Sequence, residues 1–449
     1  MNRTHSKKGS VLIGAVILAI IGAMVIGSYL SMASNEFRLA NRTLQLQSAM
    51  NLAEAGLEEG IDAINQSDWS GWTSVGSNGY IRKVSDFTFS DSRTGPFRVY
   101  VEDYDTLPIL AAEGRIISED GSEIVKQIRV HLQRSSPFSN GLTAKDTISF
   151  SGNNVSVDAY DSTLGPWNGS TNRLDQGTVA SLSVDNGALD VGNGDIWGYV
   201  ATGGGTPDVG SSGSIMGVGS TDRIDSSRIS TSFYADLPDV TVPVGTMHGI
   251  SYIVDSTTIT SLTLGSTGTS SNPEVYHIPS YSLSGTDTLE IVGPTVIIVD
   301  GSFSVSGSAS IHIDSDVDGT LELYAAGDVS ISGNGVINDA INPEAFQLWG
   351  TAPAGTSQSI SVTGNGDMAG VFYTPNADLT LVGNGGISGA AVGKTIDMTG
   401  NAAFHYDINL ANFAKQSKFT IARWRELRGV AEQLDFSDTS SLAASIKPL

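Results

Sequence analysis

The sequence predicts a mainly β protein with one long N-terminal transmembrane helix, a small antiparallel α+β head and a parallel β-solenoid. Three observations predict this order. The stretch Val11–Leu30 is apolar and uncharged, residues 80–133 alternate apolar with polar side chains, and beyond Pro137 short β-like runs are separated by Gly-Asn pairs. The expected segments are a leader at 1–9, a helix at 10–66 with its transmembrane part at 11–33, a head at 67–136, a solenoid at 137–410 and a basic C-terminal cap or tail at 411–449.

The composition excludes several classes of protein. The 449 residues carry 47 acidic and 24 basic side chains, a formal net charge of -23, so we expect no nucleic-acid partner bound through a basic face. The absence of cysteine excludes disulfides, thiolate metal sites and a cysteine nucleophile. The 52 glycines favour many turns and short strands over helices.

The N-terminal segment is predicted to enter a membrane. No charged residue lies between Lys8 and Glu36. Twenty residues, 11–30, span roughly 30 Å as a helix, which is enough to cross the hydrocarbon core of a bilayer. Arg3 and Lys7 add positive charge before this segment, which places the N-terminus in the cytoplasm and the rest of the chain in the periplasm or outside the cell.

The helical pattern continues beyond the apolar stretch. From Leu46 to Ile64 apolar residues recur at steps of three and four, with acidic and amide side chains on the other faces. One continuous helix of about 55 residues, roughly 80 Å long, is therefore expected. Two simpler interpretations stay open, a plain anchor helix and a secretory signal cleaved at the small residues Ser31–Ala33.

At its N-terminus the chain resembles the PilX-type minor pilins of the type IV pilin superfamily. The residues that carry the resemblance are Lys7-Lys8-Gly9-Ser10, the apolar stretch that follows, and the Ala-Glu-Ala-Gly segment within 51–58. The resemblance covers about the first 65 residues and implies that prepilin peptidase cleaves between Gly9 and Ser10. Most family members carry glutamate five residues into the mature chain, where this chain has Gly14. The resemblance thus implies a minor, accessory or tip subunit rather than a major one.

The head is predicted from four alternating runs. They are Tyr80–Phe89, Phe97–Asp103, Ile109–Ile117 and Glu123–Gln133. Short turns between them predict an antiparallel meander. A long helix laid against such a sheet is the arrangement of pilin heads, so the resemblance extends to about residue 135. His131 lies within the alternation and needs no functional role.

The region beyond the head is predicted to be a solenoid. Gly-Asn pairs begin at residues 152, 192, 333, 364, 383 and 400, next to short β-like runs. Glycine and asparagine accept the positive φ of tight corners, and strands at roughly twenty-residue spacing suggest stacked coils. A β-sandwich is the alternative. Gly141–Ser162 and Met368–Asp407 resemble the solenoid-like ectodomains attached to PilX-type N-termini.

A basic segment stands near the C-terminus of this acidic chain. Its cations are Lys415, Lys418, Arg423, Arg425 and Arg428. They suggest either a docking surface for an acidic partner or neighbouring subunit, or a capping element whose charges face water. The apolar neighbours Phe419, Ile421 and Trp424 are expected to pack inward.

One short motif suggests a calcium site. Asp314, Asp316 and Asp318 alternate before Gly319, as in the first half of a calcium loop. The twelfth position of such a loop holds Ala325 instead of glutamate, so the motif is not an EF-hand. An acidic turn between two strands is the alternative. No other cofactor is expected.

The sequence favours assembly and contact over catalysis. No phosphate-binding loop, nucleophile elbow or zinc-binding helix is present, and the six histidines are scattered singly. We expect a non-enzymatic minor pilin or pseudopilin-like subunit that displays its solenoid on a pilus or at the cell surface. Its partners would be other pilin subunits, the assembly machinery, prepilin peptidase and the inner membrane. The alternatives are an inner-membrane-anchored adhesin or glycan-binding protein that never enters a filament, and a surface polysaccharide lyase.

Overall fold

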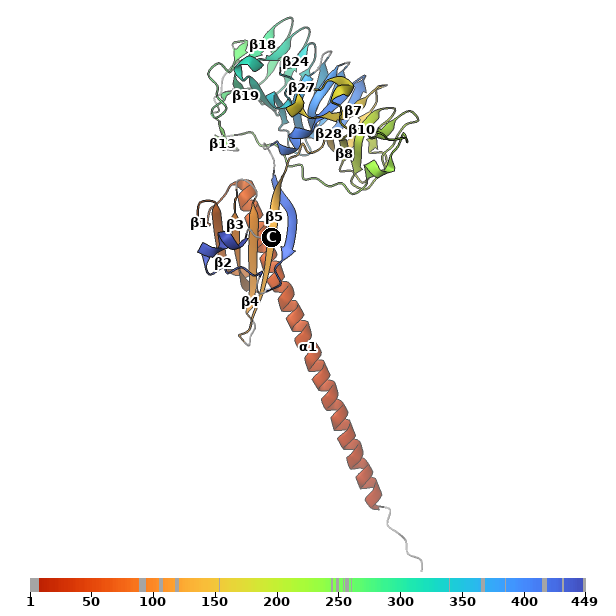
Figure 1. The fold of residues 1–449 in the computed structure, drawn as a ribbon, viewed down its shortest axis with the longest axis vertical. Coiled ribbons are helices and arrows are strands. Elements are labelled where there is room, and N and C mark those ends of the chain that lie inside the picture. The colour runs from red at the N-terminus through yellow and green to blue at the C-terminus, as the bar shows by residue number, and fades with distance from the viewer. Residues whose placement is uncertain are drawn as a thin grey trace, which may run out of the picture. The chain divides into compact units, whose positions relative to one another are not determined.

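The chain forms two compact units in a computed structural model (Figure 1). The first unit combines residues 1–134 with 418–449, and the second is residues 135–417. The structure describes residues 8–88, 94–104, 108–117, 121–152, 154–243, 245–247, 250–252, 254, 258–259, 261–338, 340–364, 368–383, 385–413, 418–429 and 432–446. The expected mainly β chain with a long N-terminal apolar helix is confirmed.

The first unit is a six-stranded sheet with one long helix. Its elements are α1 Lys8–Gln66, β1 Thr73–Val75, β2 Gly79–Thr88, β3 Thr94–Glu102, β4 Ile109–Ile117, β5 Glu123–Ser135, β30 Lys418–Glu426 and α2 Thr439–Ile446. The strand order is β1-β2-β3-β4-β5-β30, and strands β1 to β5 pair antiparallel with their neighbours. The four strands expected from the alternating runs correspond to β2, β3, β4 and β5.

Helix α1 is a single uninterrupted helix of 59 residues, as its apolar spacing predicts. It ends in a left-handed residue, Ser67, with a φ of 52°. The backbone N–H of Asp68 donates to the carbonyl of Ala63 (3.0 Å), and that of Ser67 donates to Ile64 (3.2 Å). These two bonds satisfy carbonyls of the last turn and stop the helix before the sheet begins.

The C-terminal third of α1 packs on β3 and β4 through small residues. Ala49 and Ala53 are fully buried there. A methyl group built on Gly56 would lie 2.9 Å from Cδ2 of Phe97, and one on Gly60 would lie 2.7 Å from Cδ2 of Leu110. Glycine and alanine therefore allow the helix to approach the sheet closely, and this explains the Ala-Glu-Ala-Gly segment in physical terms.

The opposite face of the head sheet is covered by the C-terminal segment. Five apolar residues of this segment pack against Ile81, Tyr100 and Ala111 of the sheet; they are Leu427, Leu434, Phe436, Leu442 and Ile446. Residues 418–446 were expected in a cap or tail that follows the solenoid; in the structure they belong to the head. The reason is that the central strands carry apolar side chains on both faces, and α1 covers only one.

Strand β30 is the last strand of the head sheet. Phe419 is buried against α1, as expected. The expectation that Ile421 and Trp424 pack inward is wrong, because they are 45% and 46% exposed. They lie on an edge strand, and neither of the two apolar clusters of the head includes them.

The second unit consists of short strands that pair in parallel. Its strands are β6 Leu142–Phe150, β7 Ser156–Tyr160, β8 Gly177–Ser181, β9 Leu189–Asp190, β10 Asp195–Thr202, β11 Ser214–Met216, β12 Ile229–Ser230, β13 Gly245–Met247, β14 Ile250–Tyr252, β15 Thr263–Leu264, β16 Glu274–Ile278, β17 Tyr281–Leu283, β18 Thr288–Ile291, β19 Pro294–Val299, β20 Phe303–Val305, β21 Ser310–Ile313, β22 Thr320–Ala325, β23 Val329–Ile331, β24 Gly335–Asn338, β25 Phe346–Gly350, β26 Ser359–Gly364, β27 Met368–Gly383, β28 Gly386–Gly400 and β29 Ala403–Asp407. Short 3-10 helices connect them at Ser162–Leu164, Gly169–Thr171, Ser226–Arg228, Ser315–Val317, Pro343–Ala345 and Ile408–Asn412. The large sheet has 18 strands, and the sheet β15-β18-β21-β24 is also parallel, whereas β13 and β14 form an antiparallel pair.

Residues in register build continuous columns across the parallel strands. Ile297, Leu323, Leu348 and Phe372 are register partners on β19, β22, β25 and β27, and all four are fully buried in the main core. The next residues along each strand form a second buried column on the other side, which includes Tyr324, Trp349 and Tyr373. Each strand is thus covered on both faces, which parallel sheets require.

Three of the six Gly-Asn pairs place glycine at a corner of the predicted kind, whereas Gly152 has no positive φ and Gly364 and Gly383 are the last residues of β26 and β27. Gly192, Gly333 and Gly400 have φ values of 53°, 78° and 79°. Only glycine adopts this left-handed region without a steric cost. The asparagines of three of these pairs, Asn153, Asn365 and Asn384, lie outside the described residues.

The chain enters the stack of parallel strands in its middle. Strand β6, the first strand of the unit, pairs with β28, the second-to-last strand of the unit. From β6 the stack continues through β8, β10 and β12, and from β28 it continues through β27, β25, β22, β19 and β16. The hydroxyl of Tyr406 donates to the carbonyl of Phe138 (2.9 Å), so the first and last parts of the unit touch. This arrangement suits a unit inserted into another domain.

Candidate functional site: the exposed apolar half of the long helix

Figure 1 shows α1 as one long continuous helix. Its N-terminal half presents apolar side chains to solvent on all its faces. The large apolar residues that are at least half exposed between residues 12 and 30 are Leu12, Ile13, Val16, Ile17, Leu18, Ile20, Ile21, Met24, Val25, Ile26 and Leu30. Several are consecutive, so no polar face is left. Its length and composition allow α1 to cross a membrane, although a signal sequence at an N-terminus would have the same properties.

The helix continues from this apolar segment into the core of the head without a break. Ser31 to Ala33, the small residues at which a secretory signal would be cleaved, lie inside α1. Within the described residues, the first fully buried position of the helix is Ala49. Residues 12–43 therefore project as a free rod of roughly 48 Å by the rise of an α-helix.

The predicted processing residues lie at the start of this rod. Gly9 and Ser10 are in the first turn of α1, directly after Lys8. Arg3 and Lys7 lie outside the described residues. Gly14 has no atom within 4 Å of where a Cβ would stand, so the isolated chain leaves room there for any side chain.

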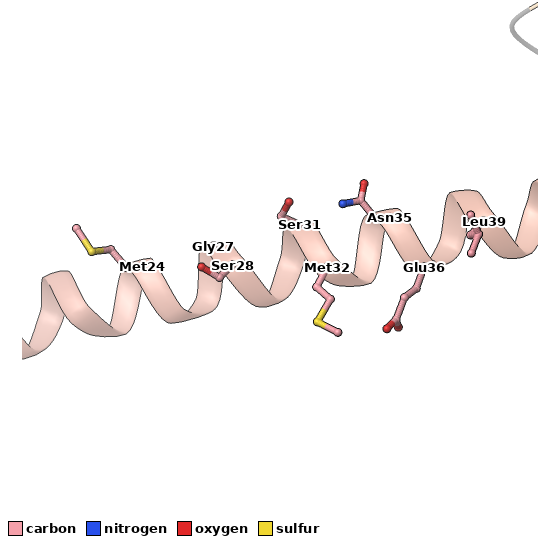
Figure 2. A pocket seen from close by; sticks show the side chains of 8 residues that line it. All are labelled: Met24, Gly27, Ser28, Ser31, Met32, Asn35, Glu36 and Leu39. Carbon is pink, nitrogen blue, oxygen red and sulfur yellow. The ribbon is translucent and has the colours of Figure 1, made fainter.

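A shallow depression runs along the rod between Met24 and Leu39. Figure 2 shows the eight side chains that line it, and all of them come from α1. Because one helix cannot enclose a space, this depression is an exposed face of the helix and not a ligand cavity. Its mixture of Ser28, Ser31 and Asn35 with apolar side chains lies where the apolar segment gives way to polar sequence.

The three aspartates of the predicted calcium site lie in a turn between β21 and β22. The carboxylate of Asp314 accepts from the backbone N–H of Asp316 (2.9 Å) and caps a single 3-10 turn. Asp318 follows with a left-handed φ of 55°. No group of three or more His, Asp or Glu side chains able to hold a metal ion occurs among the described residues. Calcium binding by these aspartates stays a prediction.

Three histidines that stand singly in the sequence pair with acids in the structure. His277 lies 2.9 Å from Asp300, and His312 lies 2.5 Å from Glu290. The Nδ1 atom of His405 lies 2.6 Å from Oδ1 of Asp158, and both residues are buried. His312 and His405 and their partners stand on adjacent strands, and Asp300 directly follows β19, which pairs with the strand of His277. The partners lie up to 247 positions apart in the chain, so only knowledge of the strand register would have revealed them.

The buried pair of His405 and Asp158 is shielded by an aromatic side chain. The ring of Trp167 stacks on the His405 ring at a centroid distance of 3.6 Å. Burial, followed by the charge of Asp407, two residues after His405, raises the pKa of Glu344. The pair is packed and covered, as expected of a structural polar contact between two neighbouring strands.

Comparisons with known proteins give a partial family match. Residues 249–413 match a family described as Domain of unknown function (DUF7305), which is less than half of the chain. No curated protein matches the chain. The competence-associated pilin ComZ from Thermus thermophilus aligns with 11% identity over 85% of this chain and 97% of its own, at a TM-score of 0.25, which is too low to show a shared fold.

Proposed function

We propose that this protein is a minor pilin-like or pseudopilin-like subunit that carries a large β-solenoid domain outside the cytoplasm. The observation that carries the proposal is the continuity of α1: one helix is apolar on every face for its first half and forms the core of the head in its last third. A helix that is apolar all round is stable only in lipid or among other helices. A subunit that moves from a membrane into a filament is surrounded first by lipid and then by other helices.

The N-terminal residues supply the chemistry of insertion and processing. The cations before residue 9 hold that end in the cytoplasm. Cleavage between Gly9 and Ser10 by prepilin peptidase would remove them and leave the whole apolar helix on the mature chain. The partners of residues 12–43 would then be the same helix of other pilin subunits, brought together by the assembly machinery.

Gly14 supports a minor role for this subunit. In the family that the N-terminus resembles, a glutamate at this position aids the packing of one subunit onto the next. Gly14 has no side chain for such a contact. A chain without the glutamate fits an accessory or tip position, where fewer neighbours must be bound.

We infer that the second unit is a β-solenoid that serves for contact. The inference rests on strands that pair in parallel and in register with strands of neighbouring coils. Each coil buries its neighbour's face, which gives an extended and rigid surface. We propose display on a pilus or at the cell surface and no catalytic activity.

Two measurements test the proposal together. Mass spectrometry of the mature protein should find Ser10 as the first residue, and filaments sheared from cells should contain the chain. Replacement of Gly9 by a bulky residue, Gly9→Leu, should block processing and leave membrane insertion unchanged.

Other outcomes would point elsewhere. A mature chain that starts at Ser34 would identify a secreted protein and overturn the proposal. An intact Met1 together with the absence of the chain from sheared filaments would favour a standing membrane anchor with an adhesin or glycan-binding domain.

A further inference from the structure

The strand at the edge of the head, β30, is exposed to an unusual degree. Of its nine residues only Phe419 is buried, and residues 420–425 are all exposed. Within the described residues, β5 is the only strand that pairs with it. Ile421 and Trp424 expose nearly half of their surface. Exposed large apolar residues on an open strand edge are typical of a surface that another protein covers.

The same strand carries positive charge that its own unit neutralises only in part. Arg423 is exposed and has no acidic partner among the described residues. Arg425 pairs with Glu432, whereas Glu426 is shared by Lys126 (2.5 Å) and Arg428 (2.7 Å). In a chain of net charge -23 this local excess of cations predicts an acidic partner.

A surface whose charge is opposite to that of β30 lies on the outer side of α1 in the same unit. Glu54, Glu58 and Asp62 are spaced four residues apart, so they form one stripe along the helix, and all three are exposed. Neither Glu54 nor Glu58 contacts a cation in the described part of the chain. The stripe faces away from the sheet, so one copy can present it and β30 at the same time.

The arginines of β30 argue against a symmetric contact, in which β30 of one copy pairs with β30 of another. Two β30 strands paired with each other would place like-charged arginines together, which is destabilising. A contact between two different surfaces of identical chains avoids this repulsion, because it sets a basic strand of one copy against an acidic stripe of the other.

We propose that β30 of one copy binds the Glu54–Glu58–Asp62 stripe on α1 of a second copy. In this contact the helix of the second copy lies along the open edge of β30, where Ile421 and Trp424 supply apolar area from opposite faces of the strand and Arg423 reaches the carboxylates of Glu54 and Glu58. The proposal names the head contact that would accompany helix packing, and so it rests on the proposed function. Its own test needs only two full-length copies in one membrane.

Cysteine cross-linking tests the contact, since the natural chain has no cysteine. Two differently tagged full-length chains, one with Trp424→Cys and one with Glu58→Cys, are expressed together and oxidised in membranes. We expect a disulfide between the two tags. Tyr234→Cys, at a position that is 85% exposed in the second unit, is the matched control and should not cross-link to Glu58→Cys.

Charge reversal tests the assigned partners. Arg423→Glu on the Trp424→Cys chain should lower the yield about fivefold or more, and Glu58→Cys in a Glu54→Arg background should restore it. Restoration also shows that both variants fold. High salt should weaken the wild-type cross-link.

Three results would overturn the proposal. They are cross-linking of Trp424→Cys to itself, equal yield with the Tyr234→Cys control, and yields that charge reversal does not change. A positive cross-link in cells whose sheared filaments lack the chain would keep this contact and reject the filament role.

Discussion

The close approach of α1 to the head sheet depends on Gly114, and its replacement by alanine is predicted to destabilise the head strongly. Gly114 lies on β4 beneath the helix. A Cβ there would clash with the carbonyl oxygen of Ala49 and would lie 2.6 Å from the backbone nitrogen of Ala53. Backbone atoms of a helix cannot turn away as a side chain can. We therefore expect Gly114→Ala to cost about 3 kcal/mol, at the upper end of typical overpacking penalties.

Two other glycines of the head provide a graded comparison. At Gly60 the nearest atoms are the ends of the Leu110 and Val99 side chains, at 2.7 and 3.1 Å, so Gly60→Ala should cost about 1 kcal/mol. At Gly429 the nearest atom is Cγ of Glu432 at 3.6 Å, an ordinary contact, so Gly429→Ala should be nearly neutral.

Hydrogen exchange with mass spectrometry is the suitable assay for this series. The chain has two units, so a single melting temperature does not report on the head alone. Peptides from β3 and β4 should lose protection in the order Gly114→Ala, Gly60→Ala, Gly429→Ala, whereas peptides from β22 and β25 should not change. Unchanged protection of β4 in Gly114→Ala would refute the packing argument.

Three further predictions concern the protonation of His131, calcium binding at Asp316 and the contact between Tyr373 and Pro238. Burial, followed by the charges of Arg129 and Arg423, lowers the pKa of His131 below 6.5, so the unfolded chain binds a proton there that the folded head does not. Urea unfolding of the head should thus show stability falling as the pH drops below about 6.5, with a smaller fall in His131→Gln. If the acidic turn binds calcium, millimolar calcium should raise the melting temperature of the second unit in the wild type but not in Asp316→Ala, and equal shifts would reject the site. The buried hydroxyl of Tyr373 donates to the carbonyl of Pro238 (2.9 Å), so Tyr373→Phe should cost about 1 kcal/mol and speed proteolysis near residue 238; unchanged proteolysis would contradict this role.

The local elements of the head could be predicted from the sequence because each has a periodic signal of its own. The uncharged run after Lys8 and the spacing from Leu46 to Ile64 predict one helix, and α1 is one helix. Alternation predicts β2 to β5. The place of β30 could not be predicted, because nothing in a local pattern states that a strand pairs with one almost 300 residues earlier.

The features of the candidate site also fall into two groups, those that a local sequence pattern predicts and those that depend on tertiary structure. An apolar helix is recognisable from composition alone, so residues 11–30 were identified without the structure. The exposure of Ile421 and Trp424 depends on where α1 and the C-terminal segment end on the sheet, which is a tertiary property. The pairing of His405 with Asp158 depends on strand register, and a shift of one residue would separate them.

The topology of the second unit follows from its insertion into the head. Strands β5 and β30 are neighbours in the head sheet, so the inserted chain must begin and end close together. Ten strands are stacked from β16 to β12 in one ladder, a length of roughly 40 Å at the spacing of neighbouring strands. A chain that entered at one end of this stack and left at the other would have its ends that far apart.

Entry in the middle of the stack lets the two ends of the inserted chain lie close together, but it also requires the chain to cross the length of the stack. After β12 the chain stands at one end of the stack, whereas β16 stands at the other, so the chain between these two strands must cross the length of the stack. On the way Leu237 and Val240 cover the outer column that contains Trp349 and Tyr373, and Asn376 donates to Asp239 (2.8 Å). Residues 231–243, the first part of this crossing, pack on the outer column and join no strand ladder. A segment that joins no ladder needs no strand periodicity, and this explains why the sequence around Asp236–Pro243 is irregular between two regions of regular strands.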